Sequence, residues 1–97
     1  MYKKITLIIS TTFLAISIPF LVVGEEQEIA LADVPDNVIA AAKAKISGLV
    51  IAEAEIEREK NSIEYELEGS ANKVDYEIEV EVNNEGKVIK VEIEEDT

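Results

Sequence analysis

Apolar and acidic residues alternate through the second half of the chain, from residue 50 to residue 93. Successive side chains of a β-strand point to opposite faces of a sheet, so this period of two predicts strands with one apolar and one charged face. Turn-forming residues interrupt the alternation at 60–62, 69–72 and 83–86. The pattern predicts an antiparallel meander of four strands, whose inward positions begin with Val50, Ile63, Val74 and Ile89.

A helical period precedes the alternation. Four apolar residues recur at the spacing of one helix face: Val38, Ile39, Ala42 and Ile46. Pro35 is favourable in a first helical turn, and Gly48 is a natural stop. We therefore predict an α+β fold in which one N-terminal helix packs on the apolar face of a four-stranded antiparallel sheet (αββββ).

The first residues have the layout of a signal peptide. Lys3 and Lys4 precede an uncharged stretch, residues 5–23, that ends at Gly24 before two glutamates. We predict a signal peptide at 1–24, a flexible acidic tether at 25–32 and one domain at 33–97. An uncleaved transmembrane anchor is the alternative, although Pro19 and several hydroxyl residues dilute the apolar run. The predicted location is secreted or periplasmic, or membrane-anchored with the domain outside the cytoplasm.

Length and charge limit the possible partners. The chain has 97 residues, no cysteine and a formal net charge of −12. A chain of this length forms at most one domain, and packing rather than disulfides must stabilise that domain. Nucleic acid is a poor partner, because it requires clustered Lys and Arg. A basic extracytoplasmic protein, a peptidase or a cation suits the charge better, and contact with a membrane is expected only through the N-terminal segment.

The residue types that usually carry catalysis are missing. The chain has neither histidine nor cysteine, and no glycine-rich phosphate loop. Paired carboxylates catalyse glycoside hydrolysis only where they flank a substrate cleft and one of them has a raised pKa. Here the alternation places the carboxylates on an open sheet face. We therefore predict a protein that is not an enzyme and has no cofactor and no catalytic or dedicated metal residues.

The carboxylate-rich sheet face is the candidate partner-binding surface. One interpretation is a solvated face that only keeps the sheet soluble. The other is a docking surface for a basic protein or for weakly held Ca²⁺, a cation that prefers oxygen ligands. No loop has the D-x-D-x-D-G spacing of a dedicated calcium site. The candidate residues are Glu53, Glu55, Glu57, Glu64, Glu66, Asp75, Glu77, Glu79 and Glu92.

The order of these elements is also distinctive. Val34-Pro35 precedes an alanine- and lysine-rich helix that stops at Gly48, and a Glu-rich strand is followed by IEYELEG and VDYEIEVEVNNEGKVIKVEIEED. This set resembles the PepSY-like family, also described as β-lactamase-inhibitor-like, over residues 31–96. The resemblance implies an extracytoplasmic binding module, related to propeptide domains that restrain thermolysin-like metallopeptidases. It implies binding or inhibition of a peptidase or another extracytoplasmic protein, and it carries over no functional residue. A cation-binding or envelope-surface protein is the alternative.

Overall fold

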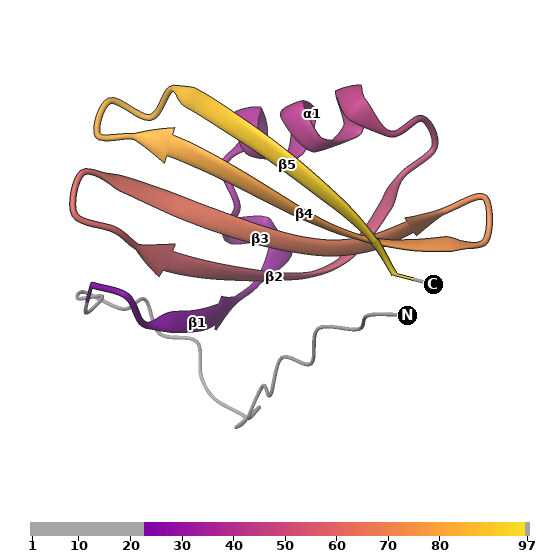
Figure 1. Ribbon diagram of the computed structural model, residues 1–97, viewed down its shortest axis with the longest axis horizontal. Coiled ribbons are helices and arrows are strands. Elements are labelled where there is room, and N and C mark those ends of the chain that lie inside the picture. The colour runs from indigo at the N-terminus through magenta and orange to yellow at the C-terminus, as the bar shows by residue number, and fades with distance from the viewer. Residues whose placement is uncertain (1–22, 97) are drawn as a thin grey trace.

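A five-stranded antiparallel sheet with one helix on one of its faces makes up the computed structural model, which describes residues 23–96 (Figure 1). The strands lie in sequence order, and each pairs with its neighbours in the chain. The elements are β1 (Glu26–Ile29), the 3-10 helix η1 (Leu31–Asp33), α1 (Asp36–Lys45), β2 (Val50–Arg58), β3 (Ser62–Ala71), β4 (Val74–Asn83) and β5 (Val88–Asp96).

The predicted αββββ arrangement is wrong, although the α+β class is right. A fifth strand, β1, precedes the helix, so α1 lies between the first two strands rather than at the N-terminal end of the fold. β1 falls within residues 25–32, where we expected a tether. Its sequence, EQEI, has one apolar residue and no alternation that predicts a strand. Pairing with the edge of β2, from Glu26 opposite Glu57 to Ile29 opposite Ala54, makes this segment a strand.

Helix α1 covers the apolar face of the sheet as predicted. Val38, Ala42 and Ile46 are buried between the helix and the sheet, and α1 packs mainly against β4 and β5. Pro35 immediately precedes the helix, and its carbonyl accepts the backbone N–H of Val38 at 3.0 Å. The first turn is also tied to a distant hairpin, because Asn37 Nδ2 donates a hydrogen bond to the Gly86 carbonyl at 2.8 Å.

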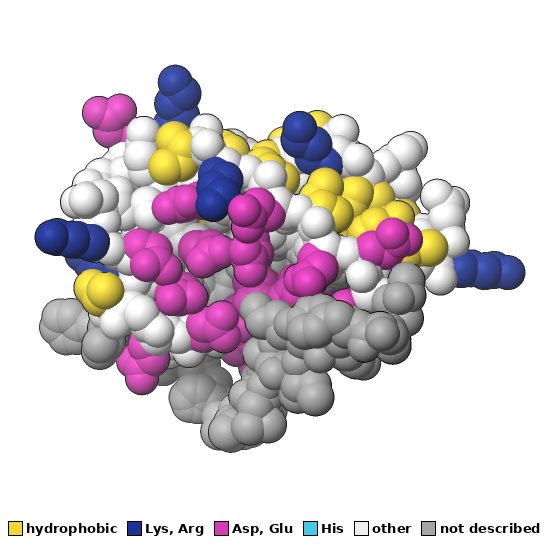
Figure 2. All heavy atoms as spheres, viewed as in Figure 1, with side chains coloured by type: hydrophobic (Ala, Val, Ile, Leu, Met, Phe, Trp, Pro, Cys, Tyr) yellow, Lys and Arg dark blue, Asp and Glu magenta, His cyan; other side chains and the backbone are white. Residues whose placement is uncertain are grey.

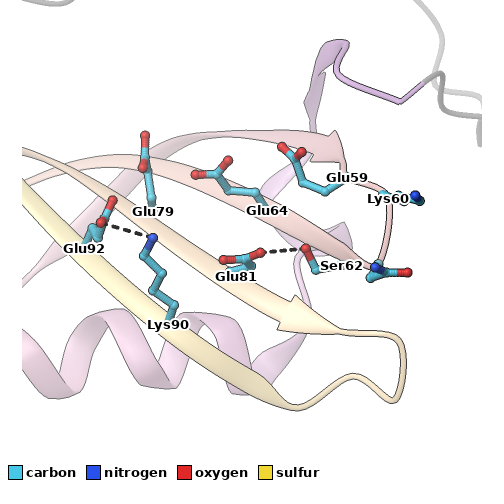
Figure 3. Close-up of a pocket in the computed structure, with 9 residues that line it drawn as sticks. Glu59, Lys60, Ser62, Glu64, Glu79, Glu81, Lys90 and Glu92 are labelled. Carbon is cyan, nitrogen blue, oxygen red and sulfur yellow. Dashed lines mark hydrogen bonds and ion pairs between the residues drawn. The ribbon is translucent and has the colours of Figure 1, made fainter.

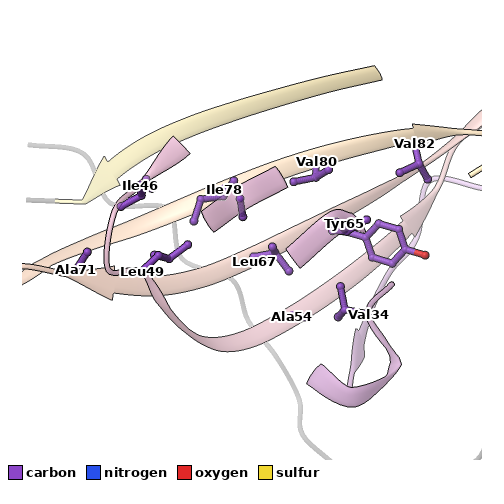
Figure 4. Close-up of a cluster of buried hydrophobic side chains, with 12 residues drawn as sticks. Val34, Ile46, Leu49, Ala54, Tyr65, Leu67, Ala71, Ile78, Val80 and Val82 are labelled. Carbon is purple, nitrogen blue, oxygen red and sulfur yellow. The ribbon is translucent and has the colours of Figure 1, made fainter. Parts of the chain in front are cut away.

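The core lies between α1 and the sheet (Figure 4). Its most deeply buried large side chains are Leu67, Ile78, Val38 and Val80. Tyr65 is buried and Tyr76 is partly buried against the same cluster, so both tyrosines face inward as the alternation predicts. Burial of such side chains contributes about 1.5–3 kcal/mol each, which makes this layer the main source of stability in a chain without disulfides.

Two β-bulges interrupt the regular alternation from which the inward positions were predicted. The register of β2 against β3 shifts between Ile51 and Glu53, and the register of β4 against β5 shifts between Glu81 and Val82. Val50, which strict alternation places inside, is therefore opposite Ser70 on the face away from α1 and is 67% exposed. Ile89, beside the second bulge on the edge strand, is 52% exposed. A bulge adds one residue to one strand and reverses the faces on its far side, so a period of two does not extend through it.

The hairpin between β3 and β4 is tighter than predicted. The expected turn at 69–72 lies mostly inside β3, which continues to Ala71 and pairs it with Val74. The two turn residues are Asn72 and Lys73, with φ of 55° and 68°. Positive φ at both central residues matches a type I′ turn, whose twist suits paired strands. Gly69 serves a different purpose, because a Cβ there would collide with the Val50 carbonyl oxygen.

The predicted signal peptide lies almost entirely outside the described residues, since residues 1–22 are not among them. Of its last two residues, Val23 forms a bridge with Arg58, and the Gly24 amide donates to the Arg58 carbonyl at 2.8 Å. In the part of the chain that is described, no helix is long and apolar enough to cross a bilayer.

Candidate partner-binding face

The face of the sheet opposite α1 is covered with carboxylates, as the magenta side chains at the centre of Figure 2 show. We call this surface the acidic face. Every strand contributes to it, because alternate positions of all five strands are acidic. Its members are Glu26, Glu28, Glu53, Glu55, Glu57, Glu64, Glu66, Glu68, Asp75, Glu77, Glu79, Glu81, Glu92, Glu94 and Asp96.

Strand register arranges these carboxylates in rows that cross the sheet. The central row consists only of glutamates, one from each strand: Glu28, Glu55, Glu66, Glu79 and Glu92. A second row runs through Glu26, Glu57, Glu64, Glu81 and Lys90, and a third through Glu53, Glu68, Glu77 and Glu94. Like charges directly opposite one another on paired strands destabilise a sheet, so these rows oppose folding.

Lys90 is the only positive residue that a strand places on this face within residues 23–96. Its Nζ lies 3.3 Å from a carboxylate oxygen of Glu92, and this contact raises the pKa of Lys90 above its ordinary value. Arg58 is opposite Ile63 and therefore lies on the α1 side of the sheet. Among the described strand residues, positive charge on the acidic face is thus confined to the β5 end of one row.

Exposure differs sharply among the carboxylates. Glu53, Glu92 and Glu94 are exposed, whereas Glu55, Glu66 and Glu77 are only 6%, 5% and 4% exposed. The three buried glutamates lie on inner strands, each with a carboxylate beside it on both neighbouring strands. The face is therefore not the uniformly solvated surface that alternation alone suggests. Its most accessible charges lie toward the ends of its rows.

Two pairs of carboxyl groups interact at the end of the acidic face near the β2–β3 turn: Glu64 with Glu79, and Glu57 with Glu59. Figure 3 shows Glu59, Glu64 and Glu79 in this region. Burial and a hydrogen bond to Glu79 raise the pKa of Glu64 to about 7. Burial and a hydrogen bond to Glu59 raise the pKa of Glu57. A carboxyl group surrounded by other carboxylates holds its proton because the charged form is repelled and poorly solvated. This end of the acidic face therefore changes its charge near neutral pH.

The same region is hollowed. A depression of about 490 Å³ is lined by residues of the β2–β3 turn, β3, β4 and β5, among them Glu59, Ser62, Glu81 and Lys90. Ser62 Oγ donates a hydrogen bond to a carboxylate oxygen of Glu81 at 2.6 Å. The surface is open and lined mainly by carboxylates, which favours a positively charged side chain over an apolar ligand.

Three groups of glutamates bring one carboxylate oxygen each to within 4.8 Å of the others. They are Glu26 with Glu55 and Glu66, Glu57 with Glu59 and Glu64, and Glu66 with Glu77 and Glu79. Oxygen-only groups of this kind match the ligand preference of Ca²⁺ rather than that of transition metals. Clusters of acidic residues are also common where no ion binds.

The structure places all nine predicted residues on the acidic face but does not gather them all. Glu55, Glu57, Glu64, Glu66, Glu77 and Glu79 belong to the three close groups. Asp75, opposite Ser70 and Asp96, lies beyond the rows, and Glu53 and Glu92 lie outside the groups. Sequence reasoning missed Glu26, Glu28, Glu59 and Glu81. The alternation indicates Glu81, whereas Glu26 and Glu28 lie in the expected tether and Glu59 follows the end of β2.

Comparison with known protein families, with curated proteins and with solved structures finds no match to this chain. The PepSY-like resemblance therefore stays a prediction.

Proposed function

We propose that this chain is a noncatalytic, exported module that binds a basic extracytoplasmic protein through its acidic face. The observation that carries the proposal is the central row of five glutamates, one from each strand. Alternating Glu and Lys would keep a sheet soluble with favourable cross-strand pairs. A surface that instead sets like charges against one another lowers its own stability, and such departures are concentrated at functional sites.

The size of the face supports a protein partner. Five strands at about 4.8 Å spacing, over about eight residues at about 3.3 Å each, give a surface of about 600 Å². A standard protein interface covers about 800 Å² on each partner. A basic patch of similar size would neutralise the rows, and the strong field of the free module would speed the encounter.

Restraint of a peptidase is the finer form of this proposal. It rests on the PepSY-like resemblance alone, and the partner would then be a peptidase with a basic surface beside its substrate cleft. Calcium binding by the close glutamate groups is the competing function. The two differ in salt and chelator dependence, because association with a basic protein weakens with added salt but needs no divalent ion.

Site-specific photo-crosslinking in the producing cells tests the proposal. The full chain carries a photo-reactive residue in place of Glu53, which is exposed on the acidic face, or in place of Ala44, which is exposed on α1. We expect a basic protein to be crosslinked from position 53 and not from position 44. A photo-reactive residue in place of Glu28 gives a second crosslinking position on the acidic face. Exchanging Glu53, Glu92 and Glu94 for Gln should reduce the crosslinking yield from position 28.

A matched control removes the same charge elsewhere. Asp33→Asn, Asp36→Asn and Glu85→Gln change three exposed carboxylates on η1, α1 and the β4–β5 turn. This variant should keep the crosslink, with CaCl2 or with a chelator. Crosslinking from the α1 position only, or equal loss in both triple variants, would contradict the proposal. A crosslink that disappears on chelation would favour the calcium function.

A further inference from the structure

Strand β5 forms one border of the sheet. Within the described part of the chain it pairs with β4 on one side and with no strand on the other (Figure 1). An edge strand presents unpaired backbone N–H and C=O groups, and an extended peptide can add to such an edge as a further strand. β1 is the other edge, but it has four residues where β5 has nine. β5 therefore offers an extended peptide the longer edge for backbone pairing.

The side chains of β5 define what an added strand would meet. Glu92 and Glu94 end the central and third rows of the acidic face, and both are exposed. Ile93, between them, ends an apolar row on the α1 side. The inner members of that row, Leu67 and Ile78, are fully buried, whereas Ile93 is 43% exposed. On both faces of the sheet, rows of side chains thus end at β5 with exposed residues that an added strand could cover.

The first part of β5 is less suited to pairing. The bulge next to Ile89 breaks the regular ladder, and Lys90 would repel an incoming cation. Bulges and lysines are the devices that keep sheet edges from pairing. Residues 91–96, beyond them, have regular register with β4 and end both rows. An added strand would therefore align with this second part.

A second copy of the chain does not fit this edge. Pairing β5 with another β5 would set carboxylates of the two copies side by side, in a chain whose net charge is −12. A different strand would fit: Lys or Arg opposite Glu92 and Glu94 would pair with these carboxylates. An apolar residue opposite Ile93 would cover its exposed side chain.

We propose that residues 91–96 of β5 dock an extended segment of the basic partner in which cationic and apolar residues alternate. The inference rests on the proposed function and specifies how that partner binds. The segment adds a sixth strand: its cations extend the rows of the acidic face, and its apolar side chains cover Ile93.

Labelled peptides and fluorescence anisotropy with the full chain test the docking. One peptide alternates Lys and Val, and a second has the same composition with all lysines first. A third carries backbone N-methyl groups at every second residue along one edge, which removes the donors of that edge. We expect the alternating peptide to bind at least about tenfold more tightly than the other two, because pattern and backbone pairing both contribute.

Charge reversal at the two edges locates the site. Glu92→Lys with Glu94→Lys should weaken binding of the alternating peptide at least about tenfold and should create binding of a Glu–Val peptide. Glu26→Lys with Glu28→Lys makes the same charge change on β1 and should weaken binding less than about threefold, through long-range charge alone. Equal effects of the two variants, or equal binding of the methylated peptide, would overturn the inference. If the docking on β5 is overturned but position 53 still crosslinks a basic protein, the proposed function stands without the docking. If neither a cationic peptide nor a basic protein binds, the docking and the proposed function both fail.

Discussion

The carboxyl group of Glu64 on β3 is hydrogen-bonded to that of Glu79 on β4, which lies diagonally across the ladder from it. A hydrogen bond between two carboxyl groups requires a proton on one of them. Burial and this contact together raise the pKa of Glu64 to about 7. The acidic face therefore gains one negative charge as the pH rises through neutrality, and this charge appears beside Glu57, Glu59 and Glu79.

Glu64→Gln should stabilise the protein at pH 8 and lose this advantage at pH 5. The pKa of Glu64 is raised on folding, so the folded state binds the proton more tightly and wild-type stability falls as the pH rises from about 4.5 to about 7. Gln is neutral throughout, so the gain at pH 8 should be about 0.5 kcal/mol, one relieved like-charge contact. Urea unfolding at both pH values measures it. Glu85→Gln, in the exposed β4–β5 turn, is the control; an equal pH trend there would contradict the prediction.

Added salt should stabilise the fold. Adjacent carboxylates of the three rows repel one another, and raising NaCl from about 0.01 M to about 1 M shortens the screening length from about 30 Å to about 3 Å. We expect the free energy of unfolding to rise by about 1–2 kcal/mol over this range. The triple Gln variant at Glu53, Glu92 and Glu94 should respond less than the control triple variant at Asp33, Asp36 and Glu85. A stability that falls with NaCl would show that the rows do not repel.

Gly69→Ala should be the most damaging single-methyl change in the sheet. The new Cβ would collide with the Val50 carbonyl oxygen and lie 3.0 Å from the Ile51 Cα, and backbone cannot move aside as a side chain can. The expected loss is about 2–3 kcal/mol in urea unfolding. Gly86→Ala adds the same methyl in open space at φ +83° and should cost about 1 kcal/mol from backbone strain alone. Equal losses would mean that β2 and β3 do not approach closely at Gly69.

Asn37→Ala should loosen the attachment of α1 to the β4–β5 hairpin. It removes the hydrogen bond from Asn37 Nδ2 to the Gly86 carbonyl, an exposed contact that joins residues 49 positions apart. The expected loss is about 0.5–1 kcal/mol. Asn84→Ala, in the same exposed turn, is the comparison and should change stability less. Hydrogen exchange of the Gly86 and Lys87 amides should also accelerate in the Asn37 variant only.

Local patterns in the sequence were sufficient for the helix, for four of the strands and for the acidic-face residues on those four strands. A period of two assigns side chains to faces without knowledge of the partner strand, and Pro35 and Gly48 bracket α1 in the same local way. For this reason all nine candidate residues lie on the expected face of the sheet.

Only the tertiary structure determined the rest. β1 becomes a strand because β2 offers it an edge, and its own four residues carry no such preference. Register decides that Glu28, Glu55, Glu66, Glu79 and Glu92 form one row, and the bulge in β2 decides that Val50 faces outward. Alternation specifies which face a side chain occupies, but its neighbours on that face depend on pairing between distant segments, and that pairing is a property of the whole sheet.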